Sequence, residues 1–199
     1  LDELYKQFTD APILGSLINP EASLVRGTLF ELKWEDVGPL LTTALKNGND
    51  DENNELAIVA KGLSLAAHNL ASKYSLVFTN VPYLARGKQD DDLAEFILNH
   101  YEIAKTDLAA VFMLRGIELL SREGVISLVE PQNWLYQAYY RKFRKHLLDK
   151  HSILLNFSLG PGAFEEITGE VVKPALTIIA KKKTKADLLY TQDASEANG

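Results

Sequence analysis

The chain has 199 residues, of which 46% are hydrophobic and 24% are charged, a composition typical of a folded domain and not of a disordered chain. Its formal net charge is −6 at pH 7, which is the wrong sign for a protein that holds nucleic acid by overall electrostatics alone, although a local basic surface remains compatible with it. The absence of cysteine excludes disulfides, thiolate metal sites and a cysteine nucleophile, and the four histidines have no spacing typical of metal ligands.

No apolar run reaches the length needed to cross a membrane, and no signal peptide opens the sequence. We therefore expect a cytoplasmic protein without a membrane partner. The first residue is Leu1 and not methionine, so we also expect the chain to be a piece or a trimmed version of a larger protein.

The amino-terminal third predicts helices and loops. Apolar residues recur at helical spacing over residues 1–8, 34–46 and 55–70, which predicts a helix in each stretch. Residues 47–54 are rich in Asn, Asp and Gly and predict a solvated loop. Because this loop lacks a glycine and a closing glutamate at the fixed spacing of a calcium-binding loop, we expect no metal there.

From Tyr74 onward, short apolar runs alternate with amphipathic stretches. The apolar runs predict strands that begin at Tyr74 and at residues 125, 153 and 174. Helices are predicted between them over residues 93–104, 107–121 and 134–150, with Thr106 as the cap of the second helix. This order predicts an α/β fold with a mostly parallel sheet, helices on its faces and a possible antiparallel last strand.

The first of these strands ends in a polar and aromatic corner. The apolar run stops at Asn80, and Val81, Pro82 and Tyr83 follow directly. Ligands in open α/β sheets bind outside the carboxyl ends of the strands, so this corner is a candidate site. The alternative is an ordinary turn at the end of a strand, since Asn and Pro are common turn residues.

The sequence Asn80-Val81-Pro82-Tyr83 resembles the Asn-Pro-Pro-Tyr signature of adenine-specific DNA methyltransferases. Later stretches resemble the features that follow this signature in the family, in the same order. These stretches are residues 107–112, 124–135, 140–148, 160–164 and 172–180. The resemblance spans about residues 74–180 and is closest to the PglX-like methyltransferases of BREX phage-resistance systems and to fused restriction–methylation enzymes.

The resemblance implies how the corner would act on a DNA base. The side-chain carbonyl of Asn80 and the backbone carbonyl of Val81 would accept the two hydrogens of an adenine amine, and Pro82 would stiffen the corner. Tyr83 would stack on an adenine flipped out of double-stranded DNA, the expected partner of the parent enzyme. Phe164 would be a second aromatic against the base, or an ordinary core phenylalanine. Val81 departs from the family pattern, because it replaces the first proline.

The resemblance also implies S-adenosyl-L-methionine as the methyl donor, with Asn80 and Asp107 as candidate contacts. The glycine-rich turn that holds this cofactor in the family is not visible before residue 74. We therefore expect a partial Rossmann-like methyltransferase domain that binds the cofactor weakly or not at all. Its parts would be a lead-in over residues 1–73, a catalytic half over 74–183 and a polar tail over 184–199.

Three further interpretations stay open. The fold could serve a non-catalytic module that binds protein or nucleic acid, or an enzyme that methylates another planar amine or amide, such as a glutamine side chain. The basic residues of 141–150 could contact a DNA backbone, or they could form the solvated side of an outer helix. Trp134 is expected to anchor the core.

Overall fold

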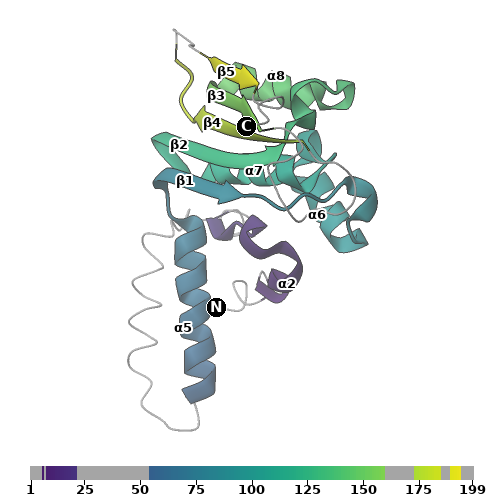
Figure 1. Cartoon of the computed structure of the whole chain (residues 1–199). Coiled ribbons are helices and arrows are strands. Elements are labelled where there is room, and N and C mark those ends of the chain that lie inside the picture. Colours follow the sequence, from purple (N-terminus) through teal and green to yellow (C-terminus); the bar gives the residue numbers. More distant parts are fainter. Residues whose placement is uncertain (1–5, 7, 22–53, 160–172, 185–188, 194–199) are drawn as a thin grey trace. The chain divides into compact units, whose positions relative to one another are not determined.

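The structure is a computed structural model that describes residues 6, 8–21, 54–159, 173–184 and 189–193 (Figure 1). The chain divides into two compact units, residues 1–72 and 73–199.

The first unit contains α2 (Ala11–Leu14), the 3₁₀-helix η1 (Gly15–Leu17) and the long helix α5 (Asn54–Ala71). Ala67 and Ala71 of α5 are buried, and Leu63 and Phe8 pack against them. The helix predicted over residues 55–70 is therefore confirmed. Pro12 lies in the first turn of α2, where its missing N–H has no intrahelical partner to lose. The helix predicted over residues 34–46 lies outside the described residues.

The second unit is built on a five-stranded sheet (Figure 1). Its strands are β1 (Tyr74–Asn80), β2 (Leu120–Pro131), β3 (Ser152–Ser158), β4 (Pro174–Ala180) and β5 (Tyr190–Asp193). They lie in the order β1-β2-β4-β3-β5. The pairs β1–β2 and β3–β5 are parallel, and β4 is antiparallel to both β2 and β3. Four of the described strands thus run in one direction and β4 runs against them, which confirms the predicted α/β class with its mostly parallel sheet.

Helices α7 (Leu108–Leu119) and α8 (Arg141–Lys150) pack on the sheet, with α7 against β1 and β2 and α8 against β3 (Figure 1). Along β2, the buried side chains alternate with half-buried ones, and Ile126, Leu128 and Glu130 are all at most 1% exposed. This period of two identifies one face of the sheet as the core. At the sheet edge, the β1 side chains Leu76 and Phe78 are 58% and 79% exposed.

Several element boundaries differ from the sequence prediction. The stretch predicted as one helix over residues 93–104 is α6 (Asp91–His100) followed by the 3₁₀-helix η4 (Glu102–Ala104). The helix predicted over 134–150 starts only at Arg141, after the 3₁₀-helices η5 (Gln132–Leu135) and η6 (Ala138–Tyr140). The physical reason is tertiary: Arg144 Nη1 donates to the carbonyls of Trp134 and Gln137 at 2.7 Å, which holds the connection in a non-helical path.

The strand β5 is a second difference, because it lies in the stretch predicted to be a polar tail. All four of its residues are exposed. Its backbone pairs in parallel with β3 from Leu155↔Tyr190 to Ser158↔Asp193. Such a strand has no apolar periodicity that sequence reasoning could detect, because the backbone ladder alone defines it.

A glycine in β2 allows the close approach of β1 at the start of their ladder. We expect Gly124→Ala to lower the free energy of unfolding by about 1–3 kcal/mol, because an added Cβ would lie 2.8 Å from the backbone oxygen of Tyr74, which cannot rotate away. Urea unfolding measures this change. The matched control is Gly87→Ala, where nothing lies within 4 Å of the added Cβ, and we expect a change within about 0.5 kcal/mol. Equal stabilities of the two variants would contradict the packing argument.

Candidate functional site

The corner after β1 lies at the carboxyl end of both β1 and β2. Asn80 is opposite Val129 in the parallel ladder, and the Val81 N–H continues that ladder by donating to the Val129 carbonyl at 3.4 Å. The Val81 side chain is buried, whereas Asn80 and Pro82 are exposed and Tyr83 is half-buried. The corner therefore presents the amide of Asn80 at the surface, while the sheet holds the adjacent peptide.

The segment after the corner is tied to the start of α7. The Leu108 N–H donates to the Leu84 carbonyl and the Arg86 N–H to the Thr106 carbonyl, both at 3.0 Å. Ala85 and Asp107 form an isolated antiparallel bridge between these two bonds. These contacts bring Asp107 to the same edge of the sheet as the corner, although 24 positions separate Tyr83 from Asp107.

Asp107 acts as the amino-terminal cap of α7. Its Oδ1 accepts a hydrogen bond from the Ala109 N–H at 2.8 Å, so the cap is Asp107 and not Thr106 as predicted. Burial raises the pKa of this carboxyl, while the hydrogen bonds from the Ala109 and Leu84 backbone oppose that rise. The predicted contact of Asp107 with a cofactor stays a prediction.

Glu130 is a site residue that the sequence analysis did not single out. It lies at the end of β2 and is fully buried. Its Oε1 accepts from Thr177 Oγ1 at 2.5 Å and from Trp134 Nε1 at 3.1 Å, and Asn156 Nδ2 donates to Thr177 Oγ1 at 2.8 Å. Oε2 has no hydrogen-bond partner among the described residues. Burial raises the pKa of Glu130 to about 8, so the carboxyl is neutral at pH 7.

Tyr83 joins the corner to these buried acids. Its hydroxyl is buried and has no hydrogen-bond partner among the described residues. Burial raises the pKa of Tyr83 to about 12, and the negative charges of Glu130 and Asp107 contribute to the rise. Burial and Asp107 likewise raise the pKa of Tyr140. We call Tyr83, Asp107, Glu130 and Tyr140 the acid–tyrosine cluster.

Most of the remaining sequence expectations can be placed as well. Trp134 is 3% exposed, so its predicted role as a core anchor is confirmed. Phe164 lies outside the described residues. Among the residues that the structure describes, no group of three or more His, Cys, Asp or Glu could hold a metal ion. The described helices also include none that is long and apolar enough to span a membrane.

Two basic side chains of α8 have partners within the fold. Arg144 donates to two backbone carbonyls, as described above, and Lys145 pairs with Asp149 at 2.7 Å. On the opposite side of this helix, Phe143 and Leu147 are fully buried. This arrangement favours the interpretation of an outer helix with one solvated side over that of a continuous DNA-contacting face.

The model of a protein family, the Eco57I restriction-modification methylase, matches residues 5–162. The chain belongs to this family. The match covers most of the chain, including the corner, α7, β2 and α8. The family that the signature motif indicates is thereby confirmed.

Two curated relatives agree with this assignment. The adenine-specific methyltransferase PglX of Lacticaseibacillus casei (strain Zhang) is 30% identical over 184 residues, which are 92% of this chain and 15% of the relative. The adenine-specific methyltransferase BrxX of Escherichia coli O9:H4 (strain HS) is 34% identical over 178 residues, which are 86% of this chain and 14% of the relative. The chain thus spans about 15% of the length of these relatives.

A solved structure shares the fold. It is a nuclease-deletion mutant of the Type ISP restriction-modification enzyme LlaGI in complex with a DNA substrate mimic. The TM-score is 0.51 at 15% sequence identity, and the match covers 77% of this chain and 17% of that one. At this identity the similarity shows the fold alone.

The raised pKa of Glu130 predicts a pH-dependent stability. The folded state keeps a proton on this carboxyl up to about pH 8, whereas the unfolded chain releases it near the ordinary value of 4.5. Stability from this group is therefore full below pH 4.5 and is lost as the pH rises toward 8, at a rate of at most about 1.4 kcal/mol per pH unit. Glu130→Gln removes the titration, so its free energy of unfolding should fall less than that of the parent between pH 5 and pH 8.

Urea unfolding at several pH values between 5 and 8 measures this difference. The control is Glu95→Gln, which removes an exposed glutamate of α6 and should leave the slope of the parent unchanged. If Glu130→Gln keeps the full slope, Glu130 is not the group that titrates.

Proposed function

We propose that the chain is the base-holding part of an adenine-specific DNA methyltransferase that serves phage defence or restriction–modification. The complete enzyme would transfer a methyl group from S-adenosyl-L-methionine to the exocyclic amine of an adenine flipped out of double-stranded DNA. Family membership and the two relatives named as adenine-specific methyltransferases support this proposal. The observation that carries it is the place of the Asn80–Tyr83 motif, at the carboxyl end of a strand with the Asn80 amide exposed.

The chemistry explains why an asparagine and a backbone carbonyl would suit this task. The lone pair of an adenine amine is delocalised into the ring, so the amine is a poor nucleophile. Two acceptors on its two hydrogens would favour a tetrahedral nitrogen and free the lone pair for attack. Asn80 Oδ1 is one acceptor, and the Val81 carbonyl is the other. The bond from the Val81 N–H to Val129 would hold this peptide in place, although Val81 lacks the proline ring of the family pattern.

Tyr83 would hold the flipped base by stacking. Its ring is half-buried, and its hydroxyl is in the protein interior near Glu130 and Asp107. A ring fixed in this way loses little side-chain freedom when a base stacks on it. Stacking on an aromatic side chain is worth roughly 1–3 kcal/mol per base, which offsets part of the cost of leaving the duplex. Phe164 stays in the proposal as a second aromatic contact.

The hollow beside the start of α7 does not by itself fit S-adenosyl-L-methionine. Asp107, Glu130, Trp134 and Tyr140 line a hollow of about 10 Å³, together with four further residues. Pockets for molecules of this kind measure roughly 300–1,000 Å³. Asp107 already accepts the capping bond of α7 from Ala109, and the Leu84 backbone also bonds this carboxyl. The described lining of this hollow therefore does not form a cofactor pocket by itself, and the roles proposed here for Asn80, Val81 and Tyr83 concern the base.

The first test is Asn80→Ala in the complete protein, with double-stranded DNA and radiolabelled S-adenosyl-L-methionine. We expect methyl incorporation to fall at least about 100-fold, because a hydrogen-bond partner aimed at the reacting group is lost. The melting temperature should stay unchanged, since the side chain is exposed. Asn99→Ala, at an exposed position of α6, is the matched control and should keep full activity. Retained methylation in Asn80→Ala would exclude the role proposed for this residue.

A pair of variants tests the stacking role of Tyr83. Tyr83→Phe keeps the ring and removes a buried hydroxyl that has no partner among the described residues, so methylation should persist. Tyr83→Ala removes the ring and should reduce methylation by about tenfold or more at limiting DNA, as expected from a loss of 1–3 kcal/mol of stacking. Fluorescence of a 2-aminopurine base at the target position would report whether the base still leaves the duplex. Equal activities of the two variants would contradict a stacking role.

A further inference from the structure

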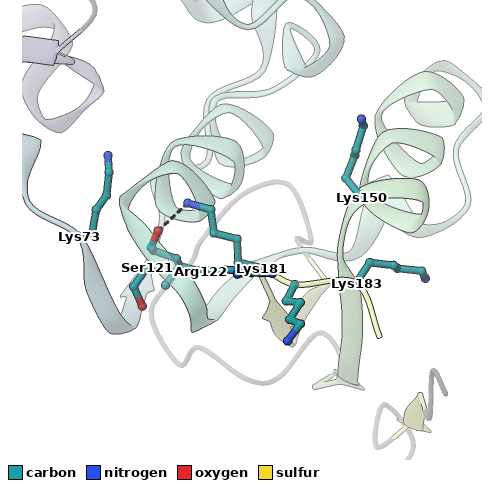
Figure 2. A pocket seen from close by; sticks show the side chains of 8 residues that line it. Lys73, Ser121, Arg122, Lys150, Lys181 and Lys183 are labelled. Atoms are coloured by element: carbon teal, nitrogen blue, oxygen red, sulfur yellow. Dashed lines mark hydrogen bonds between the residues drawn. The ribbon is translucent and has the colours of Figure 1, made fainter. Parts of the chain in front are cut away.

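A second candidate site lies at the other edge of the sheet. The start of β1, the start of β2, the end of α8 and the end of β4 surround a shallow, open hollow of about 430 Å³ (Figure 2). Six of its eight lining residues are Lys or Arg: Lys73, Arg122, Lys150, Lys181, Lys182 and Lys183. We call this hollow the basic pocket. Asn80 and Tyr83 lie at the opposite ends of the parallel strands, so the basic pocket is separate from the corner.

The backbone that carries these cations is held in place. Lys181 Nζ donates to the Leu120 carbonyl at 2.5 Å, and the Lys181 N–H donates to the Gly124 carbonyl at 3.0 Å. His151 Nδ1 bonds the Lys181 carbonyl at 2.7 Å. Three residues after Lys181, the Thr184 N–H donates to Ser152 Oγ at 2.9 Å. These hydrogen bonds hold the backbone after β4 in place. Figure 2 shows Lys181 between Lys73 and Lys150.

Among the described residues, positive charge exceeds negative charge around the basic pocket. The carboxylates described near it include Glu123, which is 2.9 Å from Lys182 and 4.0 Å from Arg122, and Asp149, which binds Lys145. The hydrogen bond from Lys145 lowers the pKa of Asp149 most, and Lys150 and Lys183 lower it further. The pKa of His151 is lowered mainly by burial, and His146, Lys181 and Lys150 add to that effect. A cluster of six cations in a chain with a net charge of −6 favours a local role in anion binding.

The chemistry of the lining favours phosphate groups over bases. No aromatic side chain is among the described residues that line the pocket, so it offers no platform for stacking. Lysine is a compact point charge that binds phosphate without reading sequence. The pocket is also shallow, whereas small ligands are enclosed over most of their surface. A continuous phosphate backbone that passes across the hollow matches these features.

We propose that the basic pocket binds adjacent phosphates of a DNA backbone, independently of sequence and at the sheet edge opposite the base-holding corner. The choice of DNA rests on the proposed function. The pocket would add affinity and hold a second stretch of the duplex, or a neighbouring turn of it, against the protein. Base recognition would remain with the corner.

Fluorescence anisotropy of the chain with a labelled 30-base-pair duplex, at several salt concentrations from 50 to 200 mM, tests the proposal. Lys150→Ala/Lys183→Ala should weaken binding about tenfold at the lowest salt and reduce the slope of log affinity against log salt by about 2, since each phosphate contact contributes about 0.9. Lys150→Arg/Lys183→Arg keeps both charges and should bind as the parent does. Melting temperatures measured by circular dichroism establish that each variant is folded.

A further variant is expected to raise the affinity for the duplex instead of lowering it. Glu123→Gln removes the carboxylate that lies beside Lys182 and Arg122, so it should tighten duplex binding about twofold to threefold. Unchanged affinity and slope in the double alanine variant would overturn the proposal, and so would a parent chain that does not bind the duplex at 50 mM salt.

Inorganic tripolyphosphate serves as competitor in a separate experiment. Displacement of the duplex only at millimolar concentration of tripolyphosphate supports a binding site for the DNA backbone. Micromolar binding of tripolyphosphate by a chain that does not bind the duplex would identify a small-polyphosphate site instead.

Failure of this inference is distinguishable from failure of the proposed function. Methylation by the complete protein reports on Asn80 and Tyr83, whereas the salt dependence of duplex binding reports on Lys150 and Lys183. If the double alanine variant loses affinity while Asn80→Ala still methylates DNA, the pocket stands and the role of the corner is overturned. The reverse result overturns the pocket alone.

Discussion

The parallel ladder between β1 and β2 places the ends of both strands at one edge of the sheet. Asn80 lies opposite Val129, and the Val81 N–H extends the ladder by one more bond to the Val129 carbonyl. Because side chains alternate between the faces of a strand, the residue after Val129 turns into the core, and that residue is Glu130. The exposed amide of the corner and the buried acid behind it thus depend on the same register. A slip of one residue would exchange the two faces and remove both features.

The buried carboxyl of Glu130 holds four segments together at this edge. Its Oε1 accepts hydrogen bonds from Thr177 in β4 and from Trp134 in the connection after β2, and Asn156 in β3 binds Thr177 in turn. A charged carboxylate with so few partners would be costly in this environment, so the neutral acid is the stable form at pH 7. A polar network of this kind specifies one arrangement of strand ends, because a misplaced strand would leave buried polar groups unpaired. This network therefore fixes the strand ends that lie behind the Asn80–Tyr83 corner.

Charge is distributed unevenly between the two edges of the sheet. The corner edge contains the acid–tyrosine cluster, whereas the opposite edge contains the basic pocket. The acidic net charge of the chain conceals this difference, because overall charge is a sum and binding responds to local potential. An enzyme that holds one base in a neutral corner and the phosphate backbone elsewhere would separate chemistry from affinity, as contacts to phosphates position a duplex and contacts to bases specify it.

The sequence by itself determined the α/β class, the positions of β1, β3 and β4, the helix α5, and the motif Asn80 to Tyr83. These features are local: a strand reveals itself through short apolar runs, and the motif is four consecutive residues at the end of one. Only the tertiary structure decided the remainder. The late start of α8 depends on the contact of Arg144 with the Trp134 carbonyl, and the strand β5 depends on its pairing with the distant strand β3. Glu130 is one glutamate among many in the sequence, and only its burial makes it distinctive. The cations of the basic pocket come from four separate stretches, which the sheet gathers because the starts of its parallel strands and the end of its one reversed strand meet at the same edge.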